Sequence, residues 1–515
     1  MSAISSIYDY SMGQPMATHS PRNPLPVAIV GAGPVGLAAA AQLAIRDEPF
    51  VLLEAGPGAG TAVDAWSHVK IFSPWRYNID RAARQLLEGI GWTEPAPGAC
   101  PTGRELIDAY LAPLAAHPAI APHLRTGTRV VRIGREALDK MKNGERKKSP
   151  FALQVESGDG EIDRLLARAV IDASGTWDIP NPLGANGMPV PGEHTLRDRI
   201  TYGIPDVLGA ARADFAGQRV LVVGSGHSAF NVLLDLARLE QEAPGTEIHW
   251  AIRQRAGRPF AGQVFGGETS DALPGRGSLG KQVRQLTSSG RLTLHTDVQI
   301  TRLHATGSGI LVETNGKPLA TALPEVDRII AVTGFRPDLA MLRELRLDLD
   351  PAVESPTALA PLIDPNLHSC GTVPPHGAGE LAHPEPDFYI AGMKSYGRAP
   401  TFLMMTGYEQ VRSIVCALTG DLDGARNVEL ALPATGVCSS DLAGASAEGD
   451  AGCCETVAAS TKIAEATGRR TDPAAPAGSC CGGATTDPGE RELVQIAPGG
   501  PRELTRAGGL GTGSG

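Results

Sequence analysis

The residues best suited to chemistry lie near the start of the chain, in the run Gly31-Ala-Gly33-Pro-Val-Gly36. An apolar strand is predicted before this run and an alanine-rich helix after it. This is the arrangement of a dinucleotide-binding turn, in which the first glycine permits the turn, the second admits a pyrophosphate and the third lets the helix pack on the strand. Glu54 ends the next apolar strand, where a carboxylate can bind the ribose hydroxyls of an adenosine. This part of the chain is therefore predicted to bind a dinucleotide.

A second turn of this kind is Gly224-Ser-Gly226-His-Ser-Ala229, in which Ala229 replaces the third glycine. Its returning strand runs into Arg253 and Arg255 instead of a carboxylate. A carboxylate would repel a 2′-phosphate, whereas an arginine can bind it, so NADPH is favoured over NADH. The alternative is that both arginines are ordinary solvated side chains. Two dinucleotide sites in one chain imply electron transfer, most economically from NADPH to a bound flavin.

Two copies of one strand–turn–helix–strand plan, at 27–54 and 219–253, must position these residues. Strand-and-turn segments at 170–175 and 328–334 indicate that the chain leaves one domain and returns to it. A further strand is predicted at 388–392 and a helix at 404–418. We predict an α/β fold with two Rossmann-like, three-layer (ββα) dinucleotide-binding domains, the second inserted in the first. The expected ranges are a disordered N-terminus (1–24), the FAD domain (25–195 and 329–435), the NADPH domain (196–328) and a disordered tail (436–515).

The composition and net charge argue against nucleic acid and membrane surfaces as partners. With 46 basic and 56 acidic residues the net charge is −10, and no long basic run points to nucleic acid or to a membrane surface. Eight cysteines in 515 residues are too few for a disulfide-built secreted protein, and residues 1–24 do not have the pattern of a signal peptide. We expect a cytoplasmic protein that acts on a small molecule, and a homodimer stays open. Residues 436–515 hold no Phe, Trp or Tyr, which predicts disorder.

Taken together, the two turns, Glu54 and the crossovers Ala173-Ser-Gly175 and Val332-Thr-Gly334 resemble the two-dinucleotide-fold flavoproteins, which include thioredoxin reductases and class B flavin monooxygenases. The resemblance covers residues 25–435. It implies FAD at Gly31, Gly33, Gly36 and Glu54, and NADPH at Gly224, Gly226, Ala229 and Arg253. The crossover glycines Gly175 and Gly334, with Gly392, are expected to complete the cofactor-binding set.

The chain also departs from this family. Disulfide reductases need a redox cysteine pair beside the flavin, but no cysteine lies between Cys100 and Cys370. The monooxygenase fingerprint Phe-x-Gly-x-x-x-His is missing from residues 176–223. The family's late Gly-Asp, whose carboxylate meets the ribityl chain, is altered as well, because strand 388–392 runs into Met393-Lys394.

Three residues are candidates for catalysis. Lys394 is expected either to approach the flavin or substrate or to be an exposed lysine. Tyr77 and Asn78 belong to the segment 66–78, which lies where the family lines its flavin pocket and is otherwise a packed surface loop.

The runs 73–78, 176–177 and 394–398 resemble flavoproteins encoded beside arsenic-resistance genes. In the tail, Cys453-Cys454 and Cys480-Cys481 could each offer two soft thiolates to As(III) or Hg(II), and 479–483 resembles the terminal cysteine pair of mercuric reductases. Coincidence in a low-complexity segment is the alternative. A metal site at His368, Cys370 and His376 is disfavoured, because prolines and glycine mark a turn-rich loop there.

The leading interpretation is an FAD-containing, NADPH-dependent oxidoreductase with a monooxygenase-like body, acting in arsenic or thiol metabolism. One alternative is a flavin reductase of a soft metal or disulfide that the tail cysteines deliver. The other is a redox sensor or metalloid-sequestering protein that holds FAD structurally.

Overall fold

A computed structural model describes residues 25–253, 264–265, 274–315, 323–367, 373–399 and 403–430. Arg255, His368, Cys370, the paired cysteines and the predicted disordered ends lie outside these residues.

The first domain is built on a five-stranded parallel sheet. Its strand order is β15 (Phe388–Ile390), β7 (Ala169–Asp172), β1 (Val27–Val30), β2 (Phe50–Leu53) and β3 (Leu124–Arg125). All residues of β1, β2 and β7 are buried, as expected for parallel strands covered on both faces. The apolar runs read from the sequence therefore form the centre of the sheet.

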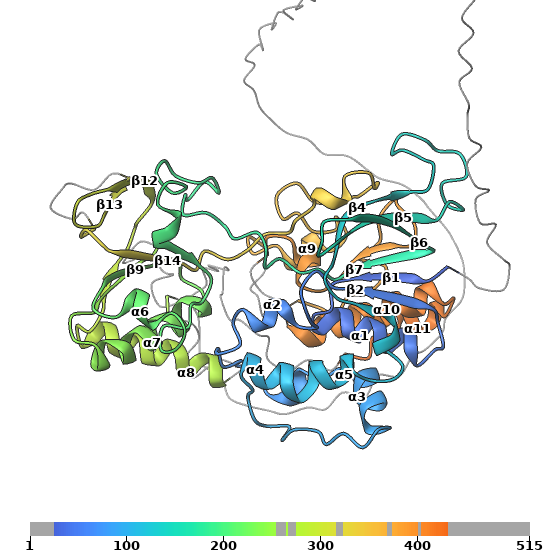
Figure 1. Cartoon of the computed structure of the whole chain (residues 1–515), viewed down its shortest axis with the longest axis horizontal. Helices are drawn as coiled ribbons and strands as arrows, with labels where there is room; N and C mark the ends of the chain where they lie inside the picture. Colours follow the sequence, from blue (N-terminus) through green and yellow to red (C-terminus); the bar gives the residue numbers. More distant parts are fainter. Residues whose placement is uncertain are drawn as a thin grey trace, which may run out of the picture. The chain divides into compact units, whose positions relative to one another are not determined.

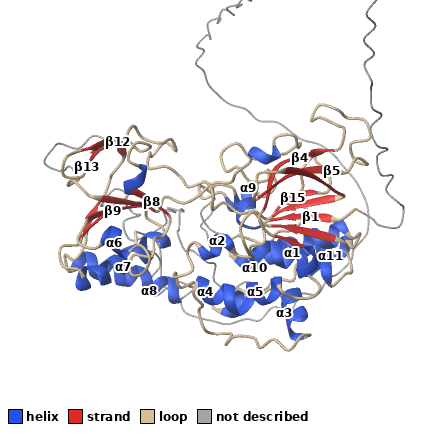
Figure 2. Cartoon of the chain, viewed as in Figure 1, coloured by secondary structure: helices blue, strands red, loops and turns tan. Residues whose placement is uncertain are grey.

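The two faces of this sheet are covered by different layers (Figures 1 and 2). Helices α1 (Pro34–Ala44) and α10 (Met404–Leu418) cover one face, and the antiparallel sheet of β4 (Thr128–Arg135), β5 (Phe151–Ser157) and β6 (Ile162–Ala167) covers the other. Successive residues of β1 alternate between these layers. Val27 and Ile29 belong to the core on the helical side, and Ala28 and Val30 to the core against the antiparallel sheet.

The second domain repeats this plan. Its parallel sheet has the order β11 (Thr293–His295), β10 (Glu247–Ala251), β9 (Arg219–Val223), β14 (Arg328–Ala331) and β8 (Ile200–Tyr202). Helices α6 (Arg212–Phe215), α7 (His227–Glu242) and α8 (Pro274–Ser288) lie on one face, and the hairpin of β12 (Ile300–Ala305) and β13 (Ile310–Thr314) lies on the other. The predicted α/β class with two three-layer domains is confirmed.

One sequence-based boundary needs correction. The sequence predicts that residues from 329 onward belong to the returning part of the first domain, but β14 pairs with β9 and β8 inside the second sheet. The reason is that β14 occupies the place that β7 has in the first sheet, beside the strand that enters the glycine-rich turn. The return to the first domain therefore begins after β14.

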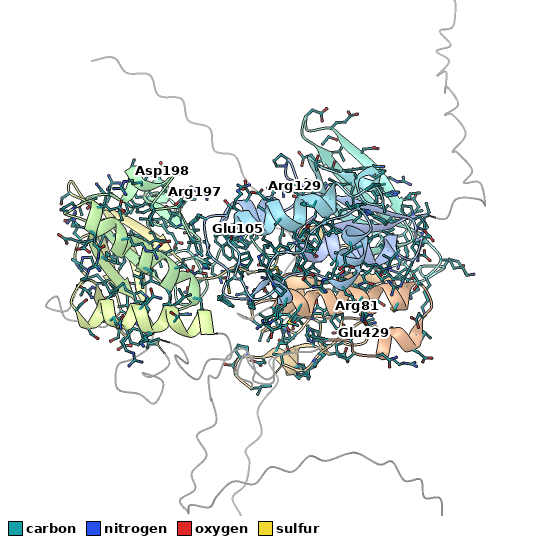
Figure 3. All side chains as sticks on the ribbon, turned by 90° about the horizontal axis from the view of Figure 1, so that it is seen from below. Arg81, Glu105, Arg129, Arg197, Asp198 and Glu429 are labelled. Atoms are coloured by element: carbon teal, nitrogen blue, oxygen red, sulfur yellow. The ribbon has the colours of Figure 1, made fainter. Side chains whose placement is uncertain are left out.

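The remaining elements are short and connect or cover these layers. They are α2 (Thr61–Asp64), η1 (Trp75–Tyr77), α3 (Arg81–Glu88), α4 (Gly103–Leu106), the π-helical η2 (Ile107–Leu111), α5 (Ala112–Ala115), η3 (Ala121–His123), η4 (Arg197–Arg199), η8 (Ala340–Leu342), α9 (Ala360–Ile363), η9 (Gly392–Tyr396) and α11 (Leu422–Arg426). An exposed ion pair of 3.1 Å between Arg81 and Glu429 ties α3 to the segment after α11 (Figure 3). Within the described residues, no helix combines the length and apolarity needed to cross a membrane.

Candidate functional site: two dinucleotide cradles

The three glycines of the first turn have different structural roles. Gly31 has φ of +94°, and a Cβ there would lie 2.8 Å from the carbonyl O of Ala173. A Cβ at Gly36 would lie 1.8 Å from the carbonyl O of Gly31, so the helix packs on the turn only without a side chain. A Cβ at Gly33, the N-cap of α1, would meet nothing within 4 Å. The open space at Gly33 and the N-terminus of α1 together fit an anionic group such as a pyrophosphate.

Glu54 is held against this turn by two backbone amides. Its Oε2 accepts a hydrogen bond of 2.7 Å from Ala32 N, and its Oε1 accepts one of 2.8 Å from Gly56 N. The carboxylate therefore joins the end of β2 to the glycine-rich turn. Each oxygen retains capacity for a further donor, such as a ribose hydroxyl.

The second turn repeats the geometry of the first. Gly224 has φ of +136°, and a Cβ there would lie 2.3 Å from the carbonyl O of Val332, just after β14. A Cβ at Gly226 would meet nothing within 4 Å, and Gly226 is the N-cap of α7. Ala229 is fully buried, so its methyl fits where the first turn has Gly36. A second anion can therefore approach at Gly226.

The strand register shows which residue corresponds to Glu54. Val30 pairs with Leu53 in the first sheet and Val223 pairs with Ala251 in the second, so Ile252 takes the place of Glu54. Ile252 is buried, and the exposed Arg253 stands one position later. We call the turn 31–36 with Glu54 the first cradle, and the turn 224–229 with the end of β10 the second cradle. The first cradle has an acid, Glu54, after its outer strand, whereas the second has a base, Arg253, one position beyond the corresponding place.

The two crossover segments lie side by side. The backbone N of Asn181 donates to Gly334 O at 2.9 Å, and its Nδ2 donates to Thr333 O at 3.1 Å. The rings of Trp177 and Phe335 stack with centroids 4.7 Å apart. Gly175 and Gly334 both have positive φ, +72° and +86°, which their tight turns require.

Lys394 is buried, which contradicts the alternative that it is an exposed lysine. Its Nζ lies 2.7 Å from Asp172 Oδ2 and donates to Ser174 Oγ at 3.0 Å. The side chain is 1% exposed because β15 lies next to β7, which brings Lys394 over the end of that strand. Ser174 is exposed and abuts Gly31, so this group borders the first cradle.

A buried hydrogen-bond network behind Gly392 was not expected from the sequence. Gly392 N donates to Gln410 Oε1 at 2.7 Å, and Gln410 Nε2 lies 2.9 Å from both Ser395 Oγ and His376 Nε2. His376 Nδ1 lies 3.0 Å from Pro374 O, so the ring donates there and accepts from Gln410. Burial lowers the pKa of His376, which favours this neutral form. His376 therefore positions a turn, and among the described residues no three ligands are grouped for a metal.

Asn78 and Tyr77 take different positions. Asn78 is fully buried, accepting from Ser73 Oγ at 2.7 Å and donating to Ser73 O at 2.8 Å. Tyr77 is half-buried, with the Arg76 guanidinium 5.0 Å from its ring centroid. Asn78 therefore stabilises the loop through its two hydrogen bonds to Ser73. Tyr77 remains partly accessible to solvent.

Asp80, Tyr110 and Tyr408 form a buried polar group that was not predicted from the sequence. Asp80 caps α3 by accepting from Ala83 N at 2.9 Å, and its own backbone N donates to Tyr110 Oη at 3.0 Å. Burial raises the pKa of Asp80 to about 6. Burial also raises the pKa of Tyr110 and of Tyr408. The position of Asp80 before an amphipathic run was a capping signal in the sequence.

The described cysteines do not form a pair. Cys100 is half-buried, with its Sγ 3.8 Å from Phe72 O. Cys416 is buried in α10, and its Sγ accepts from Arg46 at 3.3 Å. Both of these thiols are free, and Cys370 lies outside the described residues.

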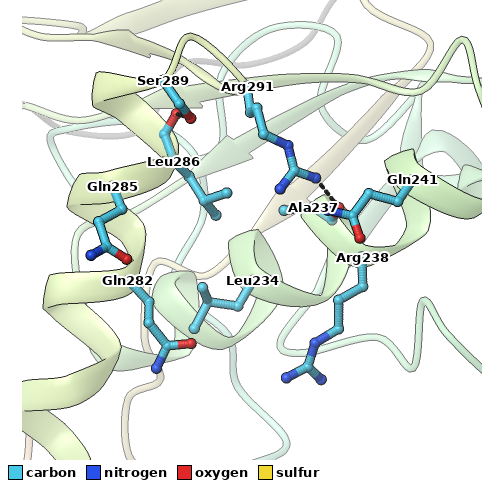
Figure 4. A pocket seen from close by; sticks show the side chains of 9 residues that line it. All are labelled: Leu234, Ala237, Arg238, Gln241, Gln282, Gln285, Leu286, Ser289 and Arg291. Carbon is cyan, nitrogen blue, oxygen red and sulfur yellow. Dashed lines mark hydrogen bonds between the residues drawn. The ribbon is translucent and has the colours of Figure 1, made fainter.

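A groove of about 380 Å³ lies between α7 and α8 (Figure 4). Its lining residues are Leu234, Ala237, Arg238, Gln241, Gln282, Gln285, Leu286, Ser289 and Arg291. The glycine-rich turn meets the opposite, N-terminal end of α7. The groove is therefore separate from the second cradle.

Comparison with known proteins agrees with this geometry. Residues 29–90 match the family model of an NAD(P)-binding Rossmann-like domain. A ferredoxin–NADP reductase of Salinispora tropica is 27% identical over 329 residues, 63% of this chain and 78% of the relative. A flavin-containing monooxygenase of Arabidopsis thaliana (FMO GS-OX-like 2) is 25% identical over 333 residues, and the match covers 60% of each chain.

A solved structure shows the same fold. The bacillithiol disulfide reductase of Bacillus cereus superposes with a TM-score of 0.55 at 18% identity, covering 78% of this chain and all of that one. In its fold, its two cradles and its relatives the chain is similar to the flavoproteins with two dinucleotide-binding domains. Its class is that of the FAD/NAD(P)H-dependent oxidoreductases.

Proposed function

We propose that the chain is an NADPH-dependent, monooxygenase-like flavoenzyme that passes electrons to oxygen and a small-molecule substrate in the cytoplasm. The observation that carries this proposal is the charge difference between the two cradles. Glu54 fits the ribose of a nucleotide without a 2′-phosphate, while Ile252 and Arg253 leave the second cradle without an acid at that position. Electrons then pass from the nucleotide of the second cradle to that of the first.

The residues of each cradle have definite tasks in this proposal. FAD, when bound, supplies a two-electron acceptor for the hydride of NADPH and a donor for the final acceptor. Gly33 and the N-terminus of α1 hold its diphosphate, Gly36 lets the helix approach, and Glu54 orients its adenosine ribose. Lys394 with Asp172 forms a neutral pair at the border of that cradle.

The second cradle binds NADPH in the same manner. Gly226 and the N-terminus of α7 receive its diphosphate. Arg253, exposed and one position past the counterpart of Glu54, is assigned to the 2′-phosphate. Arg253 Nη1 donates to Ala185 O at 3.4 Å, and no ion pair engages it within the described ranges.

The identity of the electron acceptor separates the candidate functions. The Arabidopsis relative favours oxygen, while the Salinispora relative favours an electron-transfer protein as acceptor or donor. A disulfide reductase would need a cysteine pair, and the two cysteines that the structure describes, Cys100 and Cys416, do not form one. A role in arsenic or thiol metabolism rests on the resemblance described above and on the cysteine pairs of the tail.

The decisive experiment uses the purified full-length chain. We expect a yellow protein whose flavin is reduced faster by NADPH than by NADH, with oxygen uptake on reoxidation in air. R253A should remove the NADPH preference, a loss of about 10-fold to 100-fold in selectivity for one charge-assisted phosphate contact. R197A, which removes an exposed arginine before β8, is the control and should keep it. A colourless protein that cannot be reconstituted with FAD would overturn the proposal.

A separate experiment addresses the tail. Truncation after Thr435 should leave FAD content and NADPH oxidation unchanged, while As(III) binding is lost. Full-length protein with all four paired cysteines changed to serine should lose As(III) binding equally. Equal As(III) binding by intact and truncated chains would exclude the tail as the metalloid site and remove the alternatives that depend on it.

A further inference from the structure

Arg336 is held in place beside the second cradle. It follows β14 and the crossover glycine Gly334. Its Nε donates to Asn181 Oδ1 at 2.9 Å, and its Nη2 donates to Gly187 O at 3.1 Å. Asn181 is itself fixed by hydrogen bonds to Thr333 and Gly334. The guanidinium therefore has a defined orientation before any ligand binds.

Arg336 is bound by neutral groups in the part of the chain that the structure describes. Both of its hydrogen-bond acceptors are neutral, and it forms no ion pair within 4.0 Å among the residues that the structure describes. A guanidinium has five N–H donors, so donors remain after these two bonds. A half-buried, pre-oriented guanidinium that has remaining donors and no described ion pair suits an anion with several acceptor oxygens.

Arg336 and Arg253 stand on opposite sides of the glycine-rich turn. The strand order β10–β9–β14 puts the turn after β9 in the middle, with Arg253 after β10 and Arg336 after β14. Both arginines reach one β-turn, 184–187, whose Gly187 N donates to Gly184 O at 3.0 Å. Arg253 donates to Ala185 O in that turn and Arg336 to Gly187 O. The turn 184–187 is thus hydrogen-bonded to both guanidinium groups.

We propose that Arg336 binds the diphosphate of NADPH from the β14 side of the cradle. This inference rests on the proposed function and adds a second charged contact to it. Arg253, on the β10 side, reaches the adenosine end of the nucleotide, so only Arg253 discriminates for the 2′-phosphate. Arg336 contributes equally to the binding of NADP⁺ and NAD⁺, because both carry the same diphosphate.

The test is equilibrium binding of NADP⁺ and NAD⁺ to the oxidised full-length protein by calorimetry. R336Q should weaken the binding of both nucleotides by about 10-fold or more. R253Q should weaken NADP⁺ binding alone. R197Q removes the same charge before the amino end of β8, whereas both cradle arginines follow the carboxyl ends of their strands, so it should change neither affinity (Figure 3).

Two results would contradict the assignment of Arg336 to the diphosphate. Unchanged affinities in R336Q, or a loss confined to NADP⁺, would overturn the assignment to the diphosphate. Wild-type protein that binds neither nucleotide would instead refute the proposed function. FAD content and melting temperature report whether R336Q is folded. If it is not, R336K keeps the charge but loses the forked contact with Asn181 and Gly187, and both affinities should still fall together. Unchanged affinities in R336K would then overturn the inference.

Discussion

Lys394 and Asp172, 222 residues apart in the chain, form a buried ion pair with Nζ and Oδ2 2.7 Å apart. Both side chains are almost completely buried, and only Ser174, which shares the pair's hydrogen bonds, reaches the surface. A buried pair of this kind is weak evidence for stability, but breaking it leaves an isolated charge. The border of the first cradle is therefore electrically neutral only while both partners are present.

This pair gives the first prediction. K394M should destabilise the protein by about 3–5 kcal/mol, because it leaves the Asp172 carboxylate buried without a cation. The double variant D172N/K394M should recover much of that loss, since no charge remains to be desolvated. Urea unfolding of both variants, with FAD content measured in parallel, checks the prediction. Equal stability of K394M and wild type would mean that Asp172 is protonated or solvated in the folded protein.

The second prediction concerns Gly33 and Gly36, the second and third glycines of the first turn. G36A should unfold or strongly destabilise the domain, because the new Cβ would lie 1.8 Å from Gly31 O. G33A is the matched control for stability, since its Cβ meets nothing within 4 Å and its φ of −77° suits alanine. G33A should fold normally but lose FAD, because the methyl occupies the space left for the diphosphate. Circular dichroism and flavin absorbance separate the two effects. Full FAD retention by G33A would place the diphosphate elsewhere.

The third prediction concerns Glu54. E54Q should weaken FAD retention by about 10-fold, because the amide loses charged acceptors for Ala32 N, Gly56 N and a ribose hydroxyl. E88Q, at an exposed position of α3, is the control and should retain FAD as wild type does. Fluorescence of FAD released on dilution measures the difference. If E54Q and E88Q release FAD equally, Glu54 has no part in binding it.

The fourth prediction is a pH dependence caused by Asp80. Burial raises the pKa of Asp80 from 3.8 to about 6, so the folded state favours the protonated acid. The contribution of the protonated Asp80 to the free energy of unfolding is fully present below pH 4 and is lost as the pH rises through 6. The protein is therefore about 3 kcal/mol less stable above this pH range than below it. D80N keeps a capping oxygen but cannot ionise, so the stability of wild type relative to D80N should fall between pH 4 and 6. Urea unfolding of both proteins at pH 4, 5, 6 and 8 tests this. A difference that is constant across these pH values would show that Asp80 titrates normally.

Much of the fold could be predicted from local sequence. The buried strands are continuous apolar runs, the helix of residues 404–418 has apolar side chains at helical spacing, and each glycine-rich turn marks a strand-to-helix junction. These features depend on neighbours within a few residues, so a single sequence suffices to place them. Glu54 was identifiable for the same reason, because its distance from Gly31 is fixed by one strand–helix–strand unit.

The tertiary structure alone decided which distant residues meet. Lys394 lies beside Asp172 because β15 joins the sheet next to β7, and β14 belongs to the second sheet because it pairs with β9. Neither pairing leaves a local pattern, since parallel strands are joined by long crossovers and register is set only when the sheet assembles. The burial of Lys394 and the hydrogen bond between Asn181 and Arg336 follow from that assembly. The sequence by itself therefore determined the elements and the two cradles, while packing between elements determined the charges that border them.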